Sequence, residues 1–237
     1  MDPYGVALAE MATDWRGAYV HVPLCARVCP YCDFNVIAGR DDIQGRYLTA
    51  VLSEVEREPE WSSLEAVAFG GGTPTRLPAG SLTTLVEGLS ARFGFAEAAE
   101  VSLEANPEDW SDDRAAPLVA AGFNRVSFGA QSFDPAVLAQ LGRLHRPEEI
   151  AAGLRSARGS GFASISLDLI YGTPGESVRS WTESVHRAIA LDPDHLSVYA
   201  LTVERGTALS RAINAGASAP DEDDQAQKYE IARDLLV

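Results

Sequence analysis

The chain has 237 residues, of which 46% are hydrophobic, so it is long enough to bury a core and to form one α/β domain. Its 19 basic and 34 acidic side chains give a formal net charge of −15 at pH 7, which repels phosphate backbones and argues against broad nucleic-acid binding. The first 15 residues lack the pattern of a signal peptide, and no later segment is apolar enough to span a membrane, which predicts a cytoplasmic protein.

Short β-rich runs alternate with longer runs of helical character along the whole chain. The β-rich runs predict strands at residues 18–22, 66–69, 101–105, 125–128, 164–170 and 196–201. The spacing of apolar side chains between them predicts helices at residues 46–58, 80–93, 112–121, 147–159 and 178–191. This alternation favours a parallel sheet with right-handed crossovers, either rolled into a barrel or open and doubly wound. A barrel-like unit is the simplest expectation.

The first predicted strand leads into a loop that contains all three cysteines of the chain, Cys25, Cys29 and Cys32. A structural zinc site normally has four protein ligands, whereas a cubane iron–sulfur cluster held by three thiolates leaves one iron open for a small molecule. His21 could complete a zinc site, but it falls within the predicted strand and no further Cys or His pair follows. The odd count and short spacings disfavour disulfide bonds. The loop therefore favours a reactive cluster, with structural zinc as the alternative.

Glycine and polar residues follow most of the predicted strands, which places them at one edge of a parallel sheet, where α/β enzymes bind their ligands. Gly70, Gly71 and Gly72 form such a segment after the second strand. Three glycines let the main chain approach a ligand closely, although a tight turn would explain them equally well. Their spacing matches neither a dinucleotide-binding fingerprint nor a P-loop.

Four polar or charged side chains are predicted to lie at or just beyond strand ends: Glu104, Gln131, Arg143 and Asp168. Carboxylates there could bind ribose hydroxyls or an ammonium group, and an arginine could bind a carboxylate. An isolated acidic residue at such a place is more often a solvated loop residue or a helix cap. Asp168 differs because it lies inside an apolar run, where a charge needs a partner or a ligand. We expect His145 and His186 to be surface or core histidines rather than ligands.

The motif C-x-x-x-C-x-x-C, with Tyr31 beside the last cysteine, resembles the hallmark of the radical S-adenosylmethionine (SAM) superfamily. Residues 19–34, 69–75 and 166–172 are similar to the oxygen-independent coproporphyrinogen III oxidase family, and within it to the HemW heme-chaperone branch. The resemblance covers nearly the whole chain from about residue 18. It implies an α/β fold of the radical SAM type, a partial (βα)6 TIM-like barrel, and a C-terminal domain of the family that is absent from this sequence.

The resemblance also implies cofactors and the residues that bind them. Cys25, Cys29 and Cys32 would hold a [4Fe-4S] cluster whose open iron binds SAM. The positions that line this SAM correspond to Tyr19, Tyr31, Gly71 and Glu104. The positions that surround a second SAM in the oxidase correspond to Gly72, Thr73, Gln131, Arg143, Asp168 and Ala200.

Two departures distinguish the branches of this family. The oxidase has a fourth cysteine where this chain has Phe34, and it has a longer segment before the cluster motif. Both departures favour the HemW branch, which implies binding of heme and its delivery to acceptor proteins such as respiratory enzymes. The alternative is an oxidase that decarboxylates the propionates of a porphyrinogen, and a third hypothesis is a zinc-stabilised α/β binding protein. The heme motif of the branch, HNxxYW, would fall beyond residue 237.

The predicted organisation has three parts. Residues 1–17 form an N-terminal lead, residues 18–210 form the radical SAM core, and residues 211–237 begin a linker or helix toward a further domain. The last seven residues have an amphipathic helical pattern without a cap or breaker, which favours a piece of a longer protein. The pattern leaves the oligomeric state open.

Overall fold

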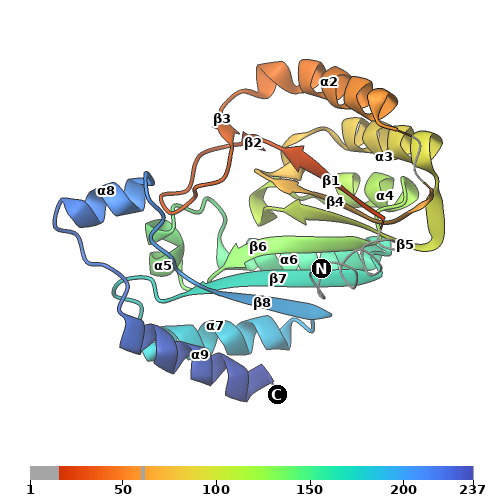
Figure 1. Cartoon of the computed structure of the whole chain (residues 1–237). Coiled ribbons are helices and arrows are strands. Elements are labelled where there is room, and N and C mark those ends of the chain that lie inside the picture. The colour runs from red at the N-terminus through yellow and green to blue at the C-terminus, as the bar shows by residue number, and fades with distance from the viewer. Residues whose placement is uncertain (1–15, 60–61, 237) are drawn as a thin grey trace, which may run out of the picture.

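A computed structural model describes residues 16–59 and 62–236. Its centre is a six-stranded parallel sheet whose strands are arranged side by side in the order in which they occur along the chain. The first and last of these six strands therefore form the two edges. The strands are β1 (Gly17–Val22), β4 (Leu64–Gly71), β5 (Phe95–Ala105), β6 (Arg125–Gln131), β7 (Ser164–Tyr171) and β8 (His195–Ala200). Figure 1 shows the sheet curving from β1 to β8 around an open inner side.

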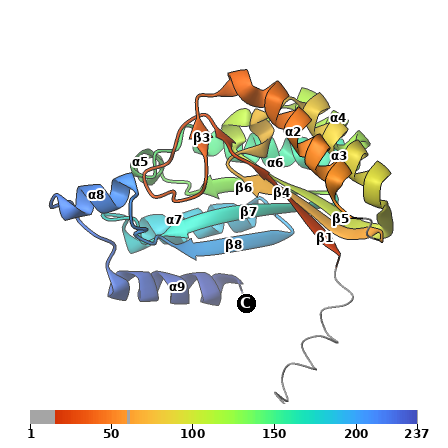
Figure 2. The same cartoon turned by 45° about the horizontal axis from the view of Figure 1, so that its top comes forward.

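Helices cover the outer side of this curved sheet, as Figures 1 and 2 show. They are α2 (Gln44–Arg57), α3 (Ala79–Phe93), α4 (Asp112–Ala120), α6 (Pro147–Ser160), α7 (Val178–Ala190) and α9 (Glu222–Leu236). Shorter elements gather at the carboxyl ends of the strands: β2 (Leu24–Cys25), β3 (Ile37–Ala38), α5 (Pro135–Gln140) and α8 (Ala208–Asn214). Single 3-10 turns complete the connections: η1 (Asp41–Ile43), η2 (Pro74–Arg76) and η3 (Pro107–Asp109).

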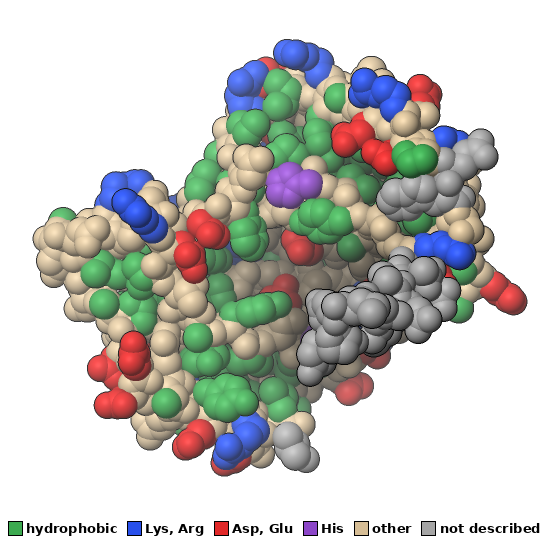
Figure 3. All heavy atoms as spheres, in the orientation of Figure 1, with side chains coloured by type: hydrophobic (Ala, Val, Ile, Leu, Met, Phe, Trp, Pro, Cys, Tyr) green, Lys and Arg blue, Asp and Glu red, His purple; other side chains and the backbone are tan. Residues whose placement is uncertain are grey.

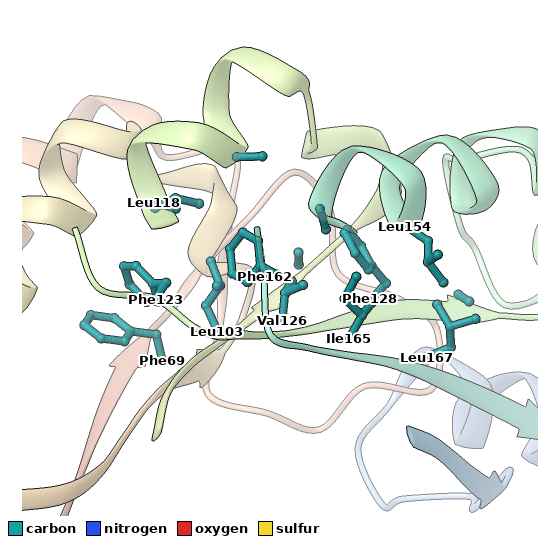
Figure 4. Packing of buried hydrophobic residues seen from close by; sticks show 14 of the residues in the cluster. Phe69, Leu103, Leu118, Phe123, Val126, Phe128, Leu154, Phe162, Ile165 and Leu167 are labelled. Carbon is teal, nitrogen blue, oxygen red and sulfur yellow. The ribbon is translucent and has the colours of Figure 1, made fainter. Parts of the chain in front are cut away.

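The hydrophobic core lies between the sheet and its outer helices. Side chains alternate along a strand, so β6 buries Val126 and Phe128 against the helices while Ser127 faces the inner side. Figure 4 shows this layer, with Phe128 and Phe162 packed below α4 and α6. Burial of each large apolar side chain stabilises the fold by about 1.5–3 kcal/mol. The core thus fixes the strands, and the inner side remains free for polar groups.

The six predicted strands and the five predicted helices are all present in the described residues. Two strands begin at least two residues earlier than predicted, β4 at Leu64 and β5 at Phe95. The short helices α5 and α8 were not predicted, because six or seven residues carry too few positions to show helical periodicity. α5 instead depends on a local cap, in which the Asp134 side chain accepts a hydrogen bond from the Ala136 amide.

The predicted domain boundaries remain predictions. Most of the N-terminal lead, residues 1–15, lies outside the described residues. At the other end, α8 crosses the predicted boundary at residue 210, and α9 packs against α7 with Ala232 buried in the main core. Within the described residues, none of the helices combines the length and hydropathy needed to cross a membrane.

A candidate cofactor site at the carboxyl ends of the strands

The cysteine loop and the carboxyl ends of the strands enclose a cavity of about 720 Å³. Figure 3 shows a hollow in the open face of the molecule, with hydrophobic side chains on its walls and acidic side chains inside it. Twelve of the thirteen residues that the sequence assigned to the cluster and SAM line the cavity: Cys25, Cys29, Tyr31, Cys32, Gly71, Gly72, Thr73, Glu104, Gln131, Arg143, Asp168 and Ala200. The thirteenth, Tyr19, lies on β1 and is 61% exposed.

The cysteine loop is closed at its base and turns sharply at its tip. Cys25 ends β2, which pairs with β3 through the register Cys25↔Ala38. At the tip, the Cys32 amide donates a hydrogen bond to the Cys29 carbonyl oxygen at 3.1 Å. All three thiols are free and partly buried. Burial raises the pKa of Cys25 and of Cys32, as expected for thiols that have lost water.

Side chains from two other segments reach the sulfur atoms of this loop, and a side chain from a third segment connects them. The Thr73 hydroxyl, after β4, donates to Cys25 Sγ at 3.7 Å. Arg143 Nη1 donates to Cys29 Sγ at 3.7 Å, and its Nη2 donates to the side-chain oxygen of Asn106. Asn106 Nδ2 in turn donates to Thr73 Oγ1 at 3.0 Å. Two of the three cysteines are therefore joined through a continuous path of hydrogen bonds.

The glycines after β4 are required by close packing around the site. Gly71 has a φ of +106°, and a Cβ there would lie 2.4 Å from Nδ1 of His21. A Cβ on Gly72 would lie 2.7 Å from the carbonyl oxygen of Leu24. The Gly71 amide donates to Glu104 Oε2 at 3.3 Å. The segment is thus a tight turn whose main chain also faces the cavity, so the two interpretations of the glycines are compatible.

Two carboxylates lie on the inner side of the sheet. Burial raises the pKa of Glu104, and it also raises the pKa of Asp168 against the opposing effect of hydrogen bonds from Ser197 and Ser127. The Ser127 hydroxyl lies 3.0 and 3.1 Å from the two oxygens of Asp168. The prediction that Asp168 needs a partner is confirmed by this serine contact. Both carboxylates still face the cavity, where they can bind hydroxyl or ammonium groups of a ligand.

Backbone geometry directs Gln131 into the cavity. Gln131 ends β6 with a φ of +62°, and the pairing of β6 with β7 shifts register between Gly129 and Gln131. Such a bulge re-aims side chains at the ends of strands, and a left-handed non-glycine residue is common at functional sites.

Arg143 was predicted at or just beyond a strand end, and this was wrong: it follows α5, in the loop before α6. Its guanidinium nevertheless reaches the end of β6, where Nη2 donates to the Gly129 carbonyl oxygen at 3.0 Å.

The donor set of this site fits an iron–sulfur cluster with SAM. Three free thiols face a cavity whose other walls carry carboxylates, an amide and glycine main chain. His21, the residue proposed to complete a zinc site, places its Nε2 2.8 Å from the Asn35 carbonyl oxygen. Because this hydrogen bond occupies Nε2, that nitrogen is not free to bind a metal ion. The sequence prediction missed Asn106; the signal for it was its place directly after β5, before Pro107.

Comparisons with known proteins agree with this site. The model of the radical SAM superfamily matches residues 19–188. Heme chaperone HemW from Mycobacterium tuberculosis is 43% identical over 94% of this chain, and heme chaperone HemW from Bacillus subtilis is 34% identical over 91% of it. Among solved structures, coproporphyrinogen III oxidase (HemN) from Escherichia coli, a radical SAM enzyme, matches 94% of the chain with a TM-score of 0.81 and 32% identity.

The chain spans only part of the length of these proteins: 59% of the mycobacterial HemW, 58% of the Bacillus HemW and 51% of HemN. The match of fold and sequence confirms the predicted radical SAM type of α/β fold, and it confirms the resemblance to HemW and to the coproporphyrinogen oxidase family. Because the family model covers well over half of the residues, including the cysteine loop, this chain belongs to the radical SAM superfamily.

Proposed function

We propose that this chain is the radical SAM part of a HemW-like heme chaperone. In this proposal it binds a [4Fe-4S] cluster, SAM and heme, and the protein delivers heme to acceptors such as respiratory enzymes in the cytoplasm. The observation that carries the proposal is the convergence of three free thiols and nine further predicted ligand residues on one cavity of about 720 Å³.

The residues of the site have separate roles in this proposal. Cys25, Cys29 and Cys32 hold the cluster, while Glu104 and the main chain at Gly71 hold SAM. When bound, the cluster supplies the electron with which this superfamily cleaves SAM. Thr73 and Arg143 donate hydrogen bonds to the sulfur atoms of Cys25 and Cys29. Asp168 on β7 and Gln131 at the end of β6 bind a second SAM or the ribose of the first.

Exposed apolar side chains around the cavity support a hydrophobic cargo. Phe34 is 63% exposed, Tyr199 is 55% exposed and Val28 is 48% exposed, and all three line the cavity. Large apolar groups exposed together commonly mark a binding site. Heme is a planar apolar ring that would bury such side chains, and the names of the HemW relatives agree with this cargo. Phe34 also replaces the fourth cysteine of the oxidase, which argues against decarboxylation.

The decisive experiment uses the full-length protein that contains this chain. Its cluster is rebuilt anaerobically, and the protein is supplied with reductant, SAM and coproporphyrinogen III while porphyrin products and 5′-deoxyadenosine are followed together. We expect intact substrate and measurable heme binding in a preparation with a proven cluster. Vinyl-bearing products would instead identify the protein as an oxidase.

Metal analysis of anaerobically purified protein separates the cluster from zinc. We expect about four irons with inorganic sulfide for each chain, and loss of the iron–sulfur absorbance in Cys29→Ala. Stoichiometric zinc without sulfide, or a full cubane in Cys29→Ala, would reject the cluster assignment. For the cluster content alone, Phe34→Ala is the matched control, because this exposed side chain lies in the same loop and is not a cluster ligand in the proposal.

A further inference from the structure

His145 is buried behind the wall of the cavity and is not one of the proposed ligands. Its side chain has no exposed surface. Nε2 lies 3.0 Å from the Ala130 carbonyl oxygen, and Nδ1 lies 3.2 Å from Oε2 of Glu108. A carbonyl oxygen only accepts, so Nε2 is the donor to Ala130. The ring is therefore held from two sides, by the end of β6 and by η3 after β5.

His145 contacts the same two segments as Arg143, which lies two residues earlier in the same loop. Arg143 joins Asn106, just before η3, to Gly129 in the bulge of β6. His145 joins the same two segments at Glu108 and Ala130. The loop at residues 141–146 is thus fixed to the ends of β5 and β6 by two side chains. A shift of this loop would move the Arg143 guanidinium away from Cys29.

The pKa of Glu108 agrees with a stable pairing of its carboxylate with His145 and Arg143. Burial alone would raise the pKa of Glu108, but the hydrogen bond from His145 and the charge of Arg143 outweigh it, so its pKa lies below the ordinary value. Glu108 is therefore a carboxylate at neutral pH and accepts hydrogen bonds only. A carboxylate between His145 and Arg143 stabilises both side chains in their observed positions.

We propose that His145, together with Glu108, is a positioning residue that holds the Arg143 guanidinium against Cys29 and fixes Ala130 beside Gln131. This inference rests on the proposed cluster at Cys29. His145 touches neither the cluster nor SAM in this arrangement, and acts through Arg143. Hydrogen bonds to cluster sulfur atoms are among the factors that set the reduction potential of a cluster, and a positive charge nearby favours the reduced form. Loss of the guanidinium from Cys29 should therefore lower the potential.

The test compares variants in two measurements. In the cluster-containing chain, the midpoint potential is measured by redox titration followed by electron paramagnetic resonance. We expect His145→Ala to lower the potential in the same direction as Arg143→Met, and the double variant to lower it little beyond Arg143→Met alone. In the metal-free chain, hydrogen exchange is measured by mass spectrometry at residues 129–131 and 141–146. We expect faster exchange there in His145→Ala.

Two further variants separate positioning from general loss of stability. His145→Gln can place a donor near Ala130, so we expect it to restore part of the potential and of the protection. Trp181→Phe is the matched control, because it removes another buried ring N–H that donates to a carbonyl oxygen, here that of Lys228 at 2.8 Å. We expect this control to leave the potential and the exchange at residues 129–131 unchanged.

The outcomes distinguish this inference from the proposed function. If the unsubstituted chain takes up no cluster, the proposed function fails, while the exchange measurement still reports whether His145 fixes the loop. If the chain holds a cluster and His145→Ala changes neither its potential nor the exchange, the positioning role is overturned. Should His145→Ala fail to fold, Glu108→Gln replaces it in both measurements, and the same unchanged values would overturn the role.

Discussion

The Arg143 guanidinium lies 3.7 Å from the sulfur of Cys29, although the two residues are 114 positions apart in the chain. The guanidinium reaches this place because its other nitrogen donates to Asn106 and to the end of β6. Burial alone would lower the pKa of Arg143, but the charge of Glu108 and the hydrogen bond to Cys29 help to keep it above its ordinary value. A permanently charged donor thus stands at the cysteine loop before any cluster is bound.

Asn106 connects Arg143 to Thr73, and its removal should loosen the site. Asn106→Ala leaves a buried guanidinium nitrogen and the Thr73 hydroxyl each without one partner. We expect the free energy of unfolding of the metal-free chain, measured in urea, to fall by about 1–3 kcal/mol. Asn35→Ala is the control, because this exposed residue engages His21 through its main-chain oxygen; we expect a change within about 0.5 kcal/mol. Equal stability of the two variants would contradict a stabilising role for the network.

Asp168 should matter more for ligand binding than for folding. Its carboxylate is partly buried and its pKa is raised by that burial, so replacement by a neutral residue relieves a desolvation cost. We expect Asp168→Asn to unfold at the same or a higher urea concentration than the unsubstituted chain. We expect Asp168→Ala to bind SAM about 10- to 100-fold more weakly in calorimetry of the cluster-containing chain, as for loss of a charged hydrogen bond.

The opposite pattern would show that Asp168 is a core residue. A large loss of stability in Asp168→Asn, together with unchanged SAM affinity in Asp168→Ala, would be that result. Ser127→Ala serves as the control, because it removes the serine hydroxyl from both carboxylate oxygens and leaves the carboxylate itself in place. We expect its effect on SAM affinity to be smaller than that of Asp168→Ala.

The sequence predicted the order of strands and helices because each strand of a parallel sheet is a distinct apolar run followed by polar residues. It predicted the shared edge for Glu104 and Asp168 for the same reason. It could not predict the path from Cys25 through Asn106 to Cys29, since this path depends on contacts between segments far apart in the chain. Nor could it predict the role of His145, because nothing in its local pattern identifies Glu108 and Ala130 as its partners.

The lowered pKa of Glu108 predicts how stability depends on pH. A carboxyl group whose pKa is lower in the folded than in the unfolded chain stabilises the fold above its unfolded pKa, which is about 4.3 for glutamate. This contribution is lost as the pH falls through the lowered, folded pKa. We therefore expect the difference in unfolding free energy between the unsubstituted chain and Glu108→Gln to be constant above about pH 5.5 and to shrink below it. A difference that grows toward acidic pH would contradict the pairing with His145 and Arg143.

Lys228 is the only lysine in the sequence. It lies on α9 and is completely buried. Its Nζ lies 2.6 Å from Oδ2 of Asp224 and 3.3 Å from Oε2 of Glu176, and it donates to the Glu176 carbonyl oxygen at 2.7 Å. Removal of one partner from a buried ion pair leaves an uncompensated charge, which costs about 3–5 kcal/mol. We expect Lys228→Met to lose stability on that scale in urea unfolding, and Lys228→Met combined with Glu176→Gln to recover part of it.

Chemical labelling tests the same burial without any substitution. An amine-reactive ester should leave Lys228 of the folded chain unmodified, because an amine with no accessible surface cannot meet the reagent. Addition of urea should expose Lys228 in the same transition that unfolds the sheet, since α9 packs against α7 and contributes Ala232 to the main core. Peptide mapping by mass spectrometry measures the modification of Lys228, with the urea-unfolded chain as the reference. Modification of Lys228 in native buffer at the rate seen in the unfolded chain would mean that α9 is not docked on the domain, and the stabilising role of the Lys228–Glu176 pair would then be rejected.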